Sequence, residues 1–314
     1  MQIINFEQIK NLNISPLQCV EWAKEAFLNK YEYELPSKIS IKLPDNVFYN
    51  TMPSLIAPEN RFGVKIVSRY PKRNPSLKSE ILLYDTQNGD LLAIMDGIWI
   101  TAMRTGAVAA LSIQRLSYSN TKQYGFIGLG NTARATLLCL AAILKNKQIS
   151  INLLAYKNQE IDFINRFKDF TQFRFSICDT TEELISTSDV VISSVTAAEN
   201  LMANDLSYKP GILVVPIHTR GFQNCDLFFD SVFVDDIGHV KDFKHFSKFK
   251  KVDEFSNVLH NENPGRISDN ERILAYNIGI SIHDIYFAHK IFDLKKEQNN
   301  EKHLLFDNTN KFWV

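Results

Sequence analysis

The feature that most constrains this chain is a glycine turn between an apolar run and a helical pattern. Residues 124–133 read Tyr-Gly-Phe-Ile-Gly-Leu-Gly-Asn-Thr-Ala, and an apolar helical run follows to residue 143. Gly128 permits a tight turn, Gly130 lets the backbone approach a phosphate, and Ala133 allows the helix to pack closely on the strand. The pattern predicts a doubly wound domain that binds a dinucleotide pyrophosphate at a helix N-terminus. Because Gly-x-Gly turns also arise by chance, a plain structural turn is the competing interpretation.

Length and charge narrow the class of protein. At about 150 residues per domain, a chain of 314 residues is expected to form roughly two domains. The 35 basic and 35 acidic residues cancel, so net charge favours neither nucleic acid nor an anionic membrane as a partner. No apolar stretch reaches about 18 residues, and the N-terminus lacks a basic region followed by an apolar run. We therefore expect a soluble, cytoplasmic protein. Its scattered cysteines are expected to be buried free thiols: Cys19, Cys139, Cys178 and Cys225.

The first part of the chain predicts a helix and a mostly antiparallel sheet. Residues 15–18 supply an N-cap serine, a proline at the first helical position and a capping-box glutamine, so a helix is expected to about Lys30. Short β-type runs follow, separated by prolines and by the hairpin signal Asn88-Gly89. The expected strands are 38–43, 62–68, 80–84 and 91–95. Residues 98–116 then have the pattern of a helix rich in small side chains.

After the glycine turn, strand and helix patterns alternate, which is typical of a parallel sheet with helices on both faces. Strands are expected at 149–155, 173–177, 190–194, 212–217, 231–235 and 273–280, and helices at 160–167, 182–187, 253–259 and 281–292. The fold class is therefore α/β. We expect a Rossmann doubly wound parallel sheet in residues 118–284 and an α+β N-terminal domain in residues 1–117. Residues from about 285 to 314 are expected to return to the N-terminal domain.

Three basic side chains stand out before the glycine turn. Arg104 lies among small apolar residues of a helical pattern, where a guanidinium needs a partner. It could bind a substrate carboxylate or a cofactor phosphate as a two-pronged fork, or form an internal ion pair with an acid. Lys65 alternates with Val64 and Ile66, so it is either part of a site or a solvent-facing lysine on an edge strand. Lys38 is a similar but weaker candidate.

Two polar segments follow expected strands of the parallel sheet, at the edge where such folds bind ligands. His218 and Arg220 come after the strand 212–217, so His218 could relay protons and Arg220 could bind an anion. A histidine that only caps the strand is the alternative. Asp235-Asp236 follows the next strand, with His239 close behind. Ligands so close along one loop fit a metal poorly, so no metal is expected.

Taken together, these segments resemble the ornithine cyclodeaminase/mu-crystallin family. The similarity spans about residues 35–290. The residues that carry it are Gly63-Val64-Lys65-Ile66-Val67, Leu83-x-Asp85 with Asn88-Gly89, Ala93-Ile94-Met95-Asp96-Gly97, Thr101-Ala102-x-Arg104-Thr105-x-Ala107, the Gly128-x-Gly130-x-x-Ala133 turn, and Ile278-Gly279-x-x-Ile282-x-Asp284. Lys65 together with the spaced Thr-x-x-Arg-Thr block is far more specific than the glycine turn.

The resemblance implies a homodimer with an N-terminal substrate-binding and dimerisation domain and a Rossmann domain. It implies an NAD(P)-dependent oxidoreductase that transfers a hydride at the Cα of an α-amino or α-imino acid. Lys38, where the family usually has arginine, would bind the substrate carboxylate together with Lys65 and Arg104. The residues then expected to bind the cofactor are Thr101, Arg104, Gly128, Gly130, Asn131, Thr132, Ala133 and Asn277.

The chain departs from the cyclodeaminase pattern after the strand 212–217. That branch carries a catalytic aspartate near the position of Arg220, and an arginine cannot accept a proton at neutral pH. The local pattern is more similar to the branch that makes 2,3-diaminopropionate for siderophores by oxidative cleavage of an N-linked amino-acid conjugate. Ornithine cyclodeaminase and ketimine or pyrroline-2-carboxylate reductase are the alternative activities, and a catalytically silent NADP-dependent ligand-binding protein is another. The general base is left open among Lys65, His218 and Asp236.

The choice between NAD and NADP is read at the end of the second strand of the doubly wound sheet. An acid there would bind the ribose 2′-hydroxyl of NAD. This chain has Ala155-Tyr156-Lys157-Asn158 at that place. Lys157 in place of an acid favours the 2′-phosphate of NADP, unless it only points to water.

Overall fold

The computed structural model describes residues 1–73, 75–145, 147–195, 202–217, 228–243 and 245–297. The chain forms two compact units. The first contains Met1–Ile14, Tyr31–Thr101 and the described residues from Ser281, and the second contains Ser15–Lys30 and the described residues between Ala102 and Ile280. These bounds differ from the expected division near residue 117, because the helix of residues 16–28 and most of the helix of residues 98–116 are grouped with the second unit.

The first unit contains a six-stranded sheet in the order β1-β6-β5-β4-β3-β2. Its strands are β1 (Gln2–Ile4), β2 (Ile39–Lys42), β3 (Phe48–Ile56), β4 (Arg61–Arg69), β5 (Leu77–Asp85) and β6 (Leu91–Asp96). All neighbours are antiparallel except β1 and β6. The four expected strands and the β5–β6 hairpin are confirmed. Strands β1 and β3 were not expected: β1 has only three residues, and Pro53 and several polar side chains interrupt the apolar pattern of β3.

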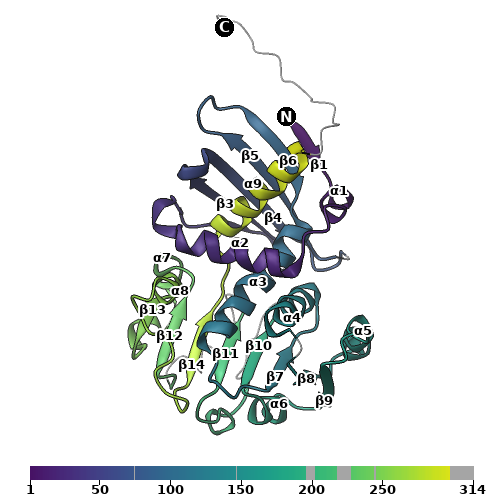
Figure 1. Cartoon of the computed structure of the whole chain (residues 1–314), viewed down its shortest axis with the longest axis vertical. Coiled ribbons are helices and arrows are strands. Elements are labelled where there is room, and N and C mark those ends of the chain that lie inside the picture. Colours follow the sequence, from purple (N-terminus) through teal and green to yellow (C-terminus); the bar gives the residue numbers. More distant parts are fainter. Residues whose placement is uncertain (74, 146, 196–201, 218–227, 244, 298–314) are drawn as a thin grey trace, which may run out of the picture. The chain divides into compact units, whose positions relative to one another are not determined.

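Helix α9 (Ser281–Glu297) lies across β3, β4 and β5 of this sheet (Figure 1). Gly63 of β4 makes the close approach possible, because a Cβ atom there would lie 2.6 Å from Ile285 Cδ1. The hydroxyl of Ser281 donates a hydrogen bond to the Pro53 carbonyl at 2.7 Å. The short helices of this unit are α1 (Phe6–Lys10), η1 (Lys30–Glu32), whose first residue is counted with the second unit, and η2 (Ala57–Glu59).

The second unit contains an eight-stranded parallel sheet in the order β13-β12-β14-β11-β10-β7-β8-β9. Its strands are β7 (Gln123–Ile127), β8 (Ile149–Leu154), β9 (Phe173–Cys178), β10 (Val190–Ser193), β11 (Leu213–Pro216), β12 (Ser231–Val234), β13 (Val252–Glu254) and β14 (Ile273–Tyr276). When β12 and β13 are left out of the numbering, the run β9-β8-β7-β10-β11-β14 has the Rossmann order 3-2-1-4-5-6. The predicted doubly wound fold is confirmed, and the order reverses between β7 and β10.

The helices associated with the second unit are α2 (Pro16–Leu28), α3 (Ile98–Leu116, from residue 102), α4 (Asn131–Leu144), α5 (Gln159–Arg166), α6 (Thr181–Thr187), α7 (Ile237–Val240) and α8 (Phe255–Leu259), with single turns η3 (Asp205–Ser207) and η4 (Phe246–Lys248). Ser15 caps α2 as predicted, by accepting a hydrogen bond from the Gln18 N–H. Helices α3 and α4 touch backbone to backbone at Gly106, where a Cβ atom would lie 2.5 Å from the Ala135 carbonyl carbon.

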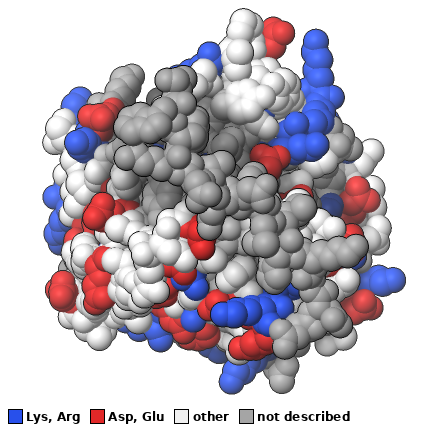
Figure 2. All heavy atoms as spheres, turned by 90° about the horizontal axis from the view of Figure 1, so that it is seen from above, with Lys and Arg blue, Asp and Glu red and all other residues white. Residues whose placement is uncertain are grey.

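The surface carries charges of both signs. On the face that Figure 2 shows, described acidic and basic side chains are interspersed, with no extended area of one sign. Across the described residues, none of the helices combines the length and the apolar character that a bilayer span requires. Three of the cysteines, Cys19, Cys139 and Cys178, are buried free thiols, and burial raises the pKa of Cys19 to about 12. Cys225 lies outside the described residues.

Candidate functional site

The glycine turn has the geometry that a dinucleotide site needs. Gly128 follows β7 with φ of +82°, and a Cβ atom there would lie 3.0 Å from the Ser194 backbone at the end of β10. Gly130 is the N-cap of α4, makes no side-chain capping bond and has open space where its Cβ would be. The first N–H groups of α4 are therefore available to an anion. The turn lies where the strand order reverses, which is the ligand-binding position of open α/β sheets.

Two buried polar atoms at the same edge of the sheet have no hydrogen-bond partner among the described residues. They are Ser194 Oγ, just after β10, and Asn277 Oδ1, just after β14. A buried polar atom of this kind is expected to find its partner in water or a ligand. The open Gly130 cradle and these two atoms fit a dinucleotide lying along the carboxyl ends of β7, β10, β11 and β14.

The predicted cofactor-binding residues around the glycine turn differ in how deeply they are buried. Ala133 is fully buried, Thr132 is half-buried and Asn131 is exposed in the first turn of α4. Asn131 and Thr132 therefore present side chains beside the free N–H groups. In the first unit, the Thr101 hydroxyl lies 3.0 Å from the Ser79 hydroxyl.

Arg104 is buried in α3, with 5% of its surface exposed. Its guanidinium packs against Gly279, where a Cβ atom would lie 2.6 Å from Nη1, and Gly279 has φ of +81°. Only glycine satisfies both conditions. The charge of Arg104 also acts on Asp235, a fully buried carboxyl group that accepts the Gly279 N–H at 2.8 Å. The acid that the ion-pair interpretation of Arg104 requires is therefore present nearby, and the flat guanidinium lies against backbone.

Lys65 is not a solvent-facing lysine on an edge strand, because β4 is an interior strand and only 1% of Lys65 is exposed. Its ammonium group donates to Asp284 Oδ1 of α9 at 2.8 Å, and Asp284 is fully buried. Burying two charges is tolerated when they pair in good geometry. Asp284 belongs to the family pattern that begins at Ile278, but its pairing with Lys65 depends on how α9 packs on the sheet. No periodicity in the sequence indicates that pairing.

Asp236 is already bound to two cationic groups. Its carboxylate pairs with Lys30 at 2.9 Å and with His239 Nδ1 at 2.8 Å, and it also caps α7. Although burial opposes ionisation, the hydrogen bonds from His239 and Lys30 hold the pKa of Asp236 well below its usual range. Such a carboxylate is a weak proton acceptor, which argues against Asp236 as the general base.

A buried cluster around Lys30 was missed by reasoning from the sequence. Lys30 is 5% exposed and bridges Asp236 and Glu254, and Glu254 also accepts the Ile237 N–H at 2.8 Å. Lys30 was expected only as the end of a helix. The acids come from the ends of β12 and β13, so only their alignment in the sheet reveals the cluster. In the described part of the chain, no group of three or more His, Cys, Asp or Glu side chains is arranged to hold a metal ion.

The segment after β8 presents a lysine and an aromatic ring. Lys157 Nζ lies 5.0 Å from the centre of the Tyr156 ring, and both side chains are exposed. Lys157 and Asn158 adopt left-handed backbone conformations. Glu160, three residues after Lys157, is buried and accepts the Tyr156 N–H at 3.1 Å. The Glu160 carboxylate thus stabilises the backbone of this turn by a hydrogen bond.

The structure gives less information on the remaining predicted site residues. His218 and Arg220 lie outside the described residues. Lys38 is half-buried just before β2.

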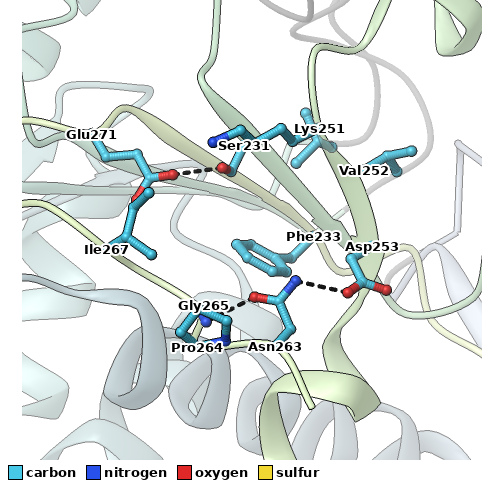
Figure 3. Close-up of a pocket in the computed structure, with 11 residues that line it drawn as sticks. Ser231, Phe233, Lys251, Val252, Asp253, Asn263, Pro264, Gly265, Ile267 and Glu271 are labelled. Atoms are coloured by element: carbon cyan, nitrogen blue, oxygen red, sulfur yellow. Dashed lines mark hydrogen bonds between the residues drawn. The ribbon is translucent and has the colours of Figure 1, made fainter. Parts of the chain in front are cut away.

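Two cavities lie away from this edge, near the amino ends of strands. One cavity, of about 400 Å³, lies beside β12 and β13. Two hydrogen bonds connect polar side chains that line it: Ser231 donates to Glu271, and Asn263 donates to Asp253 (Figure 3). The other, of about 560 Å³, is lined by the C-terminal ends of α3 and α4 and by residues 117–122. Because ligands of doubly wound folds bind at the carboxyl ends of strands, neither cavity belongs to the candidate site.

Comparison with known families decides the relationship that the sequence suggested. The model of the ornithine cyclodeaminase/mu-crystallin family matches residues 2–299. The chain belongs to this family. The suggested link to the 2,3-diaminopropionate branch is not part of that finding.

Relatives within this family match over almost the whole chain. The nodulation efficiency protein NfeD of Rhizobium meliloti is 24% identical over 308 residues, covering 94% of this chain and 93% of the relative. The Δ1-pyrroline-2-carboxylate reductase of Colwellia psychrerythraea is 26% identical over 319 residues, covering 93% and 99%. The structure of Thermococcus litoralis Δ1-pyrroline-2-carboxylate reductase in complex with NADH and L-proline has a TM-score of 0.85 at 22% identity, covering 95% and 98%. That likeness confirms the fold.

Proposed function

We propose that this protein is an NAD(P)-dependent oxidoreductase that transfers a hydride at the Cα of a small α-amino or α-imino acid. The observation that carries the proposal is the open glycine turn at the switch point of a 3-2-1-4-5-6 sheet, in a chain of the ornithine cyclodeaminase/mu-crystallin family. Bound NAD(P) supplies the hydride chemistry. Gly128, Gly130, Asn131 and Thr132 would hold its pyrophosphate.

Basic side chains of this chain are proposed to bind the carboxylate of the anionic substrate. We assign Arg104 to the substrate carboxylate, because its guanidinium is buried, rigidly packed on Gly279 and suited to two-pronged binding. The family resemblance implies that Lys65, which pairs with Asp284, and Lys38 also bind the substrate carboxylate. Asp236 is ion-paired with Lys30 and His239. We therefore assign proton transfer at the substrate nitrogen to Lys65 or His218.

Reduction of a cyclic imino acid is the finer activity that we favour. Relatives named Δ1-pyrroline-2-carboxylate reductase match nearly the whole chain. The resemblance places the catalytic aspartate of the cyclodeaminase branch near Arg220, and an arginine there cannot act as the proton acceptor of ornithine cyclisation. Oxidative cleavage of an N-linked conjugate is the second candidate, and the residues that suggest it are His218-Thr219-Arg220.

Turnover of a substrate panel tests the function. The absorbance of the reduced nicotinamide is followed with cyclic imines, with amino acids and with N-linked amino-acid conjugates. Arg104→Ala is expected to abolish turnover while dinucleotide binding largely persists, and Arg115→Ala on the same helix is the control. Undiminished turnover in Arg104→Ala would refute the carboxylate assignment. Dinucleotide binding without turnover of any compound would instead indicate a catalytically silent ligand-binding protein.

We also propose a preference for NADP. Lys157 stands where an acid would bind the 2′-hydroxyl of NAD, and the carboxylate of Glu160 accepts a hydrogen bond from the Tyr156 backbone N–H. A 2′-phosphate would gain a charge-assisted bond from Lys157. Titration is expected to give tighter binding of NADPH than of NADH, and Lys157→Ala should remove most of that difference. The exposed Lys168→Ala is the control, and an equal affinity for both cofactors in the wild type would refute the preference.

We also propose that the protein forms a homodimer. The first unit exposes several large apolar side chains on or beside its edge strand β2: Ile39, Ile41, Leu43 and Tyr49. Exposed apolar strips next to an unpaired edge strand commonly mark interfaces. Sedimentation equilibrium is expected to give twice the monomer mass, and a monomer at working concentration would refute the proposal.

A further inference from the structure

Asn277 occupies a defined place in the doubly wound sheet. It follows β14, which lies between β12 and β11 (Figure 1), and its N–H donates to the Pro216 carbonyl at the end of β11 at 3.0 Å. The side chain is 3% exposed. In the 3-2-1-4-5-6 order, β14 is the sixth strand, so Asn277 lies at its ligand-binding carboxyl end.

Neighbouring groups fix the orientation of the Asn277 amide. Nδ2 donates to Asp235 Oδ1 at 3.1 Å and to Ser112 Oγ at 3.2 Å. The other carboxyl oxygen of Asp235 accepts the Gly279 N–H at 2.8 Å. Burial raises the pKa of Asp235, whereas the Gly279 N–H and the charge of Arg104 favour its ionised form. Because Nδ2 donates to both Asp235 and Ser112, the nitrogen side of the amide faces these two groups.

The amide oxygen then faces the other way. Asn277 Oδ1 is buried and accepts no hydrogen bond from the described residues. A buried acceptor without a donor is unfavourable, so the site favours a ligand that brings an N–H group. Both amide protons are already used on the opposite side.

The position of Asn277 indicates which part of a dinucleotide provides that donor. The segment after β8 is the one that contacts the adenosine ribose in doubly wound folds, so the adenosine half of the dinucleotide is expected at β7, β8 and β9. The strands β10, β11 and β14 are left for the nicotinamide half. The nicotinamide ring carries a primary carboxamide, whose NH₂ group is a donor of the required kind.

We propose that Asn277 Oδ1 accepts a hydrogen bond from the nicotinamide carboxamide and that Asp235 is the positioning residue that holds the amide in this orientation. The inference rests on the proposed function, since it assumes that a nicotinamide dinucleotide binds. It adds how this chain recognises the ring itself. Asp235 acts without touching the cofactor.

The test compares two dinucleotides in the absence of any substrate. Reduced 3-acetylpyridine adenine dinucleotide has a methyl ketone in place of the carboxamide, so it keeps the carbonyl and lacks the N–H donor. Isothermal titration is expected to show that the wild type binds NADH about fivefold to tenfold more tightly than the analogue, the value of one neutral hydrogen bond. Asn277→Ala should reduce that ratio to near one.

Two further variants distinguish recognition of the nicotinamide carboxamide from a general loss of dinucleotide binding. Ser194→Ala, which removes the hydroxyl beside Gly128, should weaken both dinucleotides equally and leave the ratio unchanged. Asp235→Asn should lower the ratio, because its new amide group can donate to Asn277 Oδ1 and turn that acceptor away. Thermal unfolding confirms that each variant is folded.

The outcomes are distinct. An unchanged ratio in Asn277→Ala, or a ratio near one in the wild type, would overturn the inference while the proposed function stands. A retained ratio in Asn277→Ala with weaker amino-acid binding to the enzyme–NADH complex would place the substrate nitrogen at Oδ1 instead. If the wild type binds neither NADH nor NADPH, the proposed function itself fails.

Discussion

The buried pair of Lys65 and Asp284 gives a sharp quantitative prediction. Their exposed fractions are 1% and 0% for the side chains, and Nζ and Oδ1 lie 2.8 Å apart. Removing one partner of a buried ion pair leaves the other charge in an apolar environment and costs about 3–5 kcal/mol of folding free energy. Replacing both partners by apolar side chains of similar size is often nearly neutral.

Three variants form the cycle: Lys65→Met, Asp284→Leu and the double variant. Each single substitution is expected to lower the free energy of unfolding of the first unit by about 3–5 kcal/mol. The double variant should be less destabilised than the sum of the singles by several kcal/mol, because neither buried charge is then left behind. Lys78→Met, an exposed lysine on β5, is the control and should change stability by less than about 0.5 kcal/mol.

Urea unfolding followed by circular dichroism measures the stability of the wild type and of all four variants. Turnover provides an independent readout, since the stable double variant should still lack activity if Lys65 serves the substrate. Additive effects of the two single substitutions would refute the pairing. A double variant with wild-type turnover would refute the functional assignment of Lys65.

Two further predictions concern packing and pH. Gly106→Ala should destabilise the protein by about 2 kcal/mol although alanine is the better helix former, because the new methyl group would lie 2.5 Å from the Ala135 backbone; a raised melting temperature would contradict the close contact. Asp189 accepts hydrogen bonds from the Lys122 and Gln123 N–H groups and from Lys209, which lower its pKa although burial opposes ionisation. Its stabilisation is therefore present above the unfolded pKa of about 4 and is lost as the pH falls through the lower folded value. Asp189→Asn should cost about 2 kcal/mol at neutral pH, with a deficit that shrinks in acid; a deficit independent of pH in melting curves would contradict this account.

Much of the fold could be predicted because its signals are local. The N-cap at Ser15, the hairpin at Asn88-Gly89 and the glycine turn after β7 depend on residues adjacent in the chain, and all three are found where expected. Strand β3 was missed because Pro53 breaks its pattern. It is stabilised by pairing along its whole length with β4, which no local signal reports.

The division into compact units illustrates the same limit. The patterns of residues 16–28 and 98–116 predict helices, but not the unit against which each helix packs. Contacts of α2 with α4 and α8, and of Gly106 with the α4 backbone, group these helices with the parallel sheet. A period of apolar residues shows that a face is buried and does not identify its partner.

By itself the sequence determined that the chain has a dinucleotide-type turn, an alternating strand and helix region, and basic residues suited to an anionic substrate. The tertiary structure alone decided which acid faces each buried cation: Asp284 for Lys65, and Asp236 with Glu254 for Lys30. It also decided that Asn277 presents a buried oxygen with no partner among the described residues. The physical reason is that helix and turn signals act over a few residues, whereas charge pairing and amide orientation act between strands far apart in the chain.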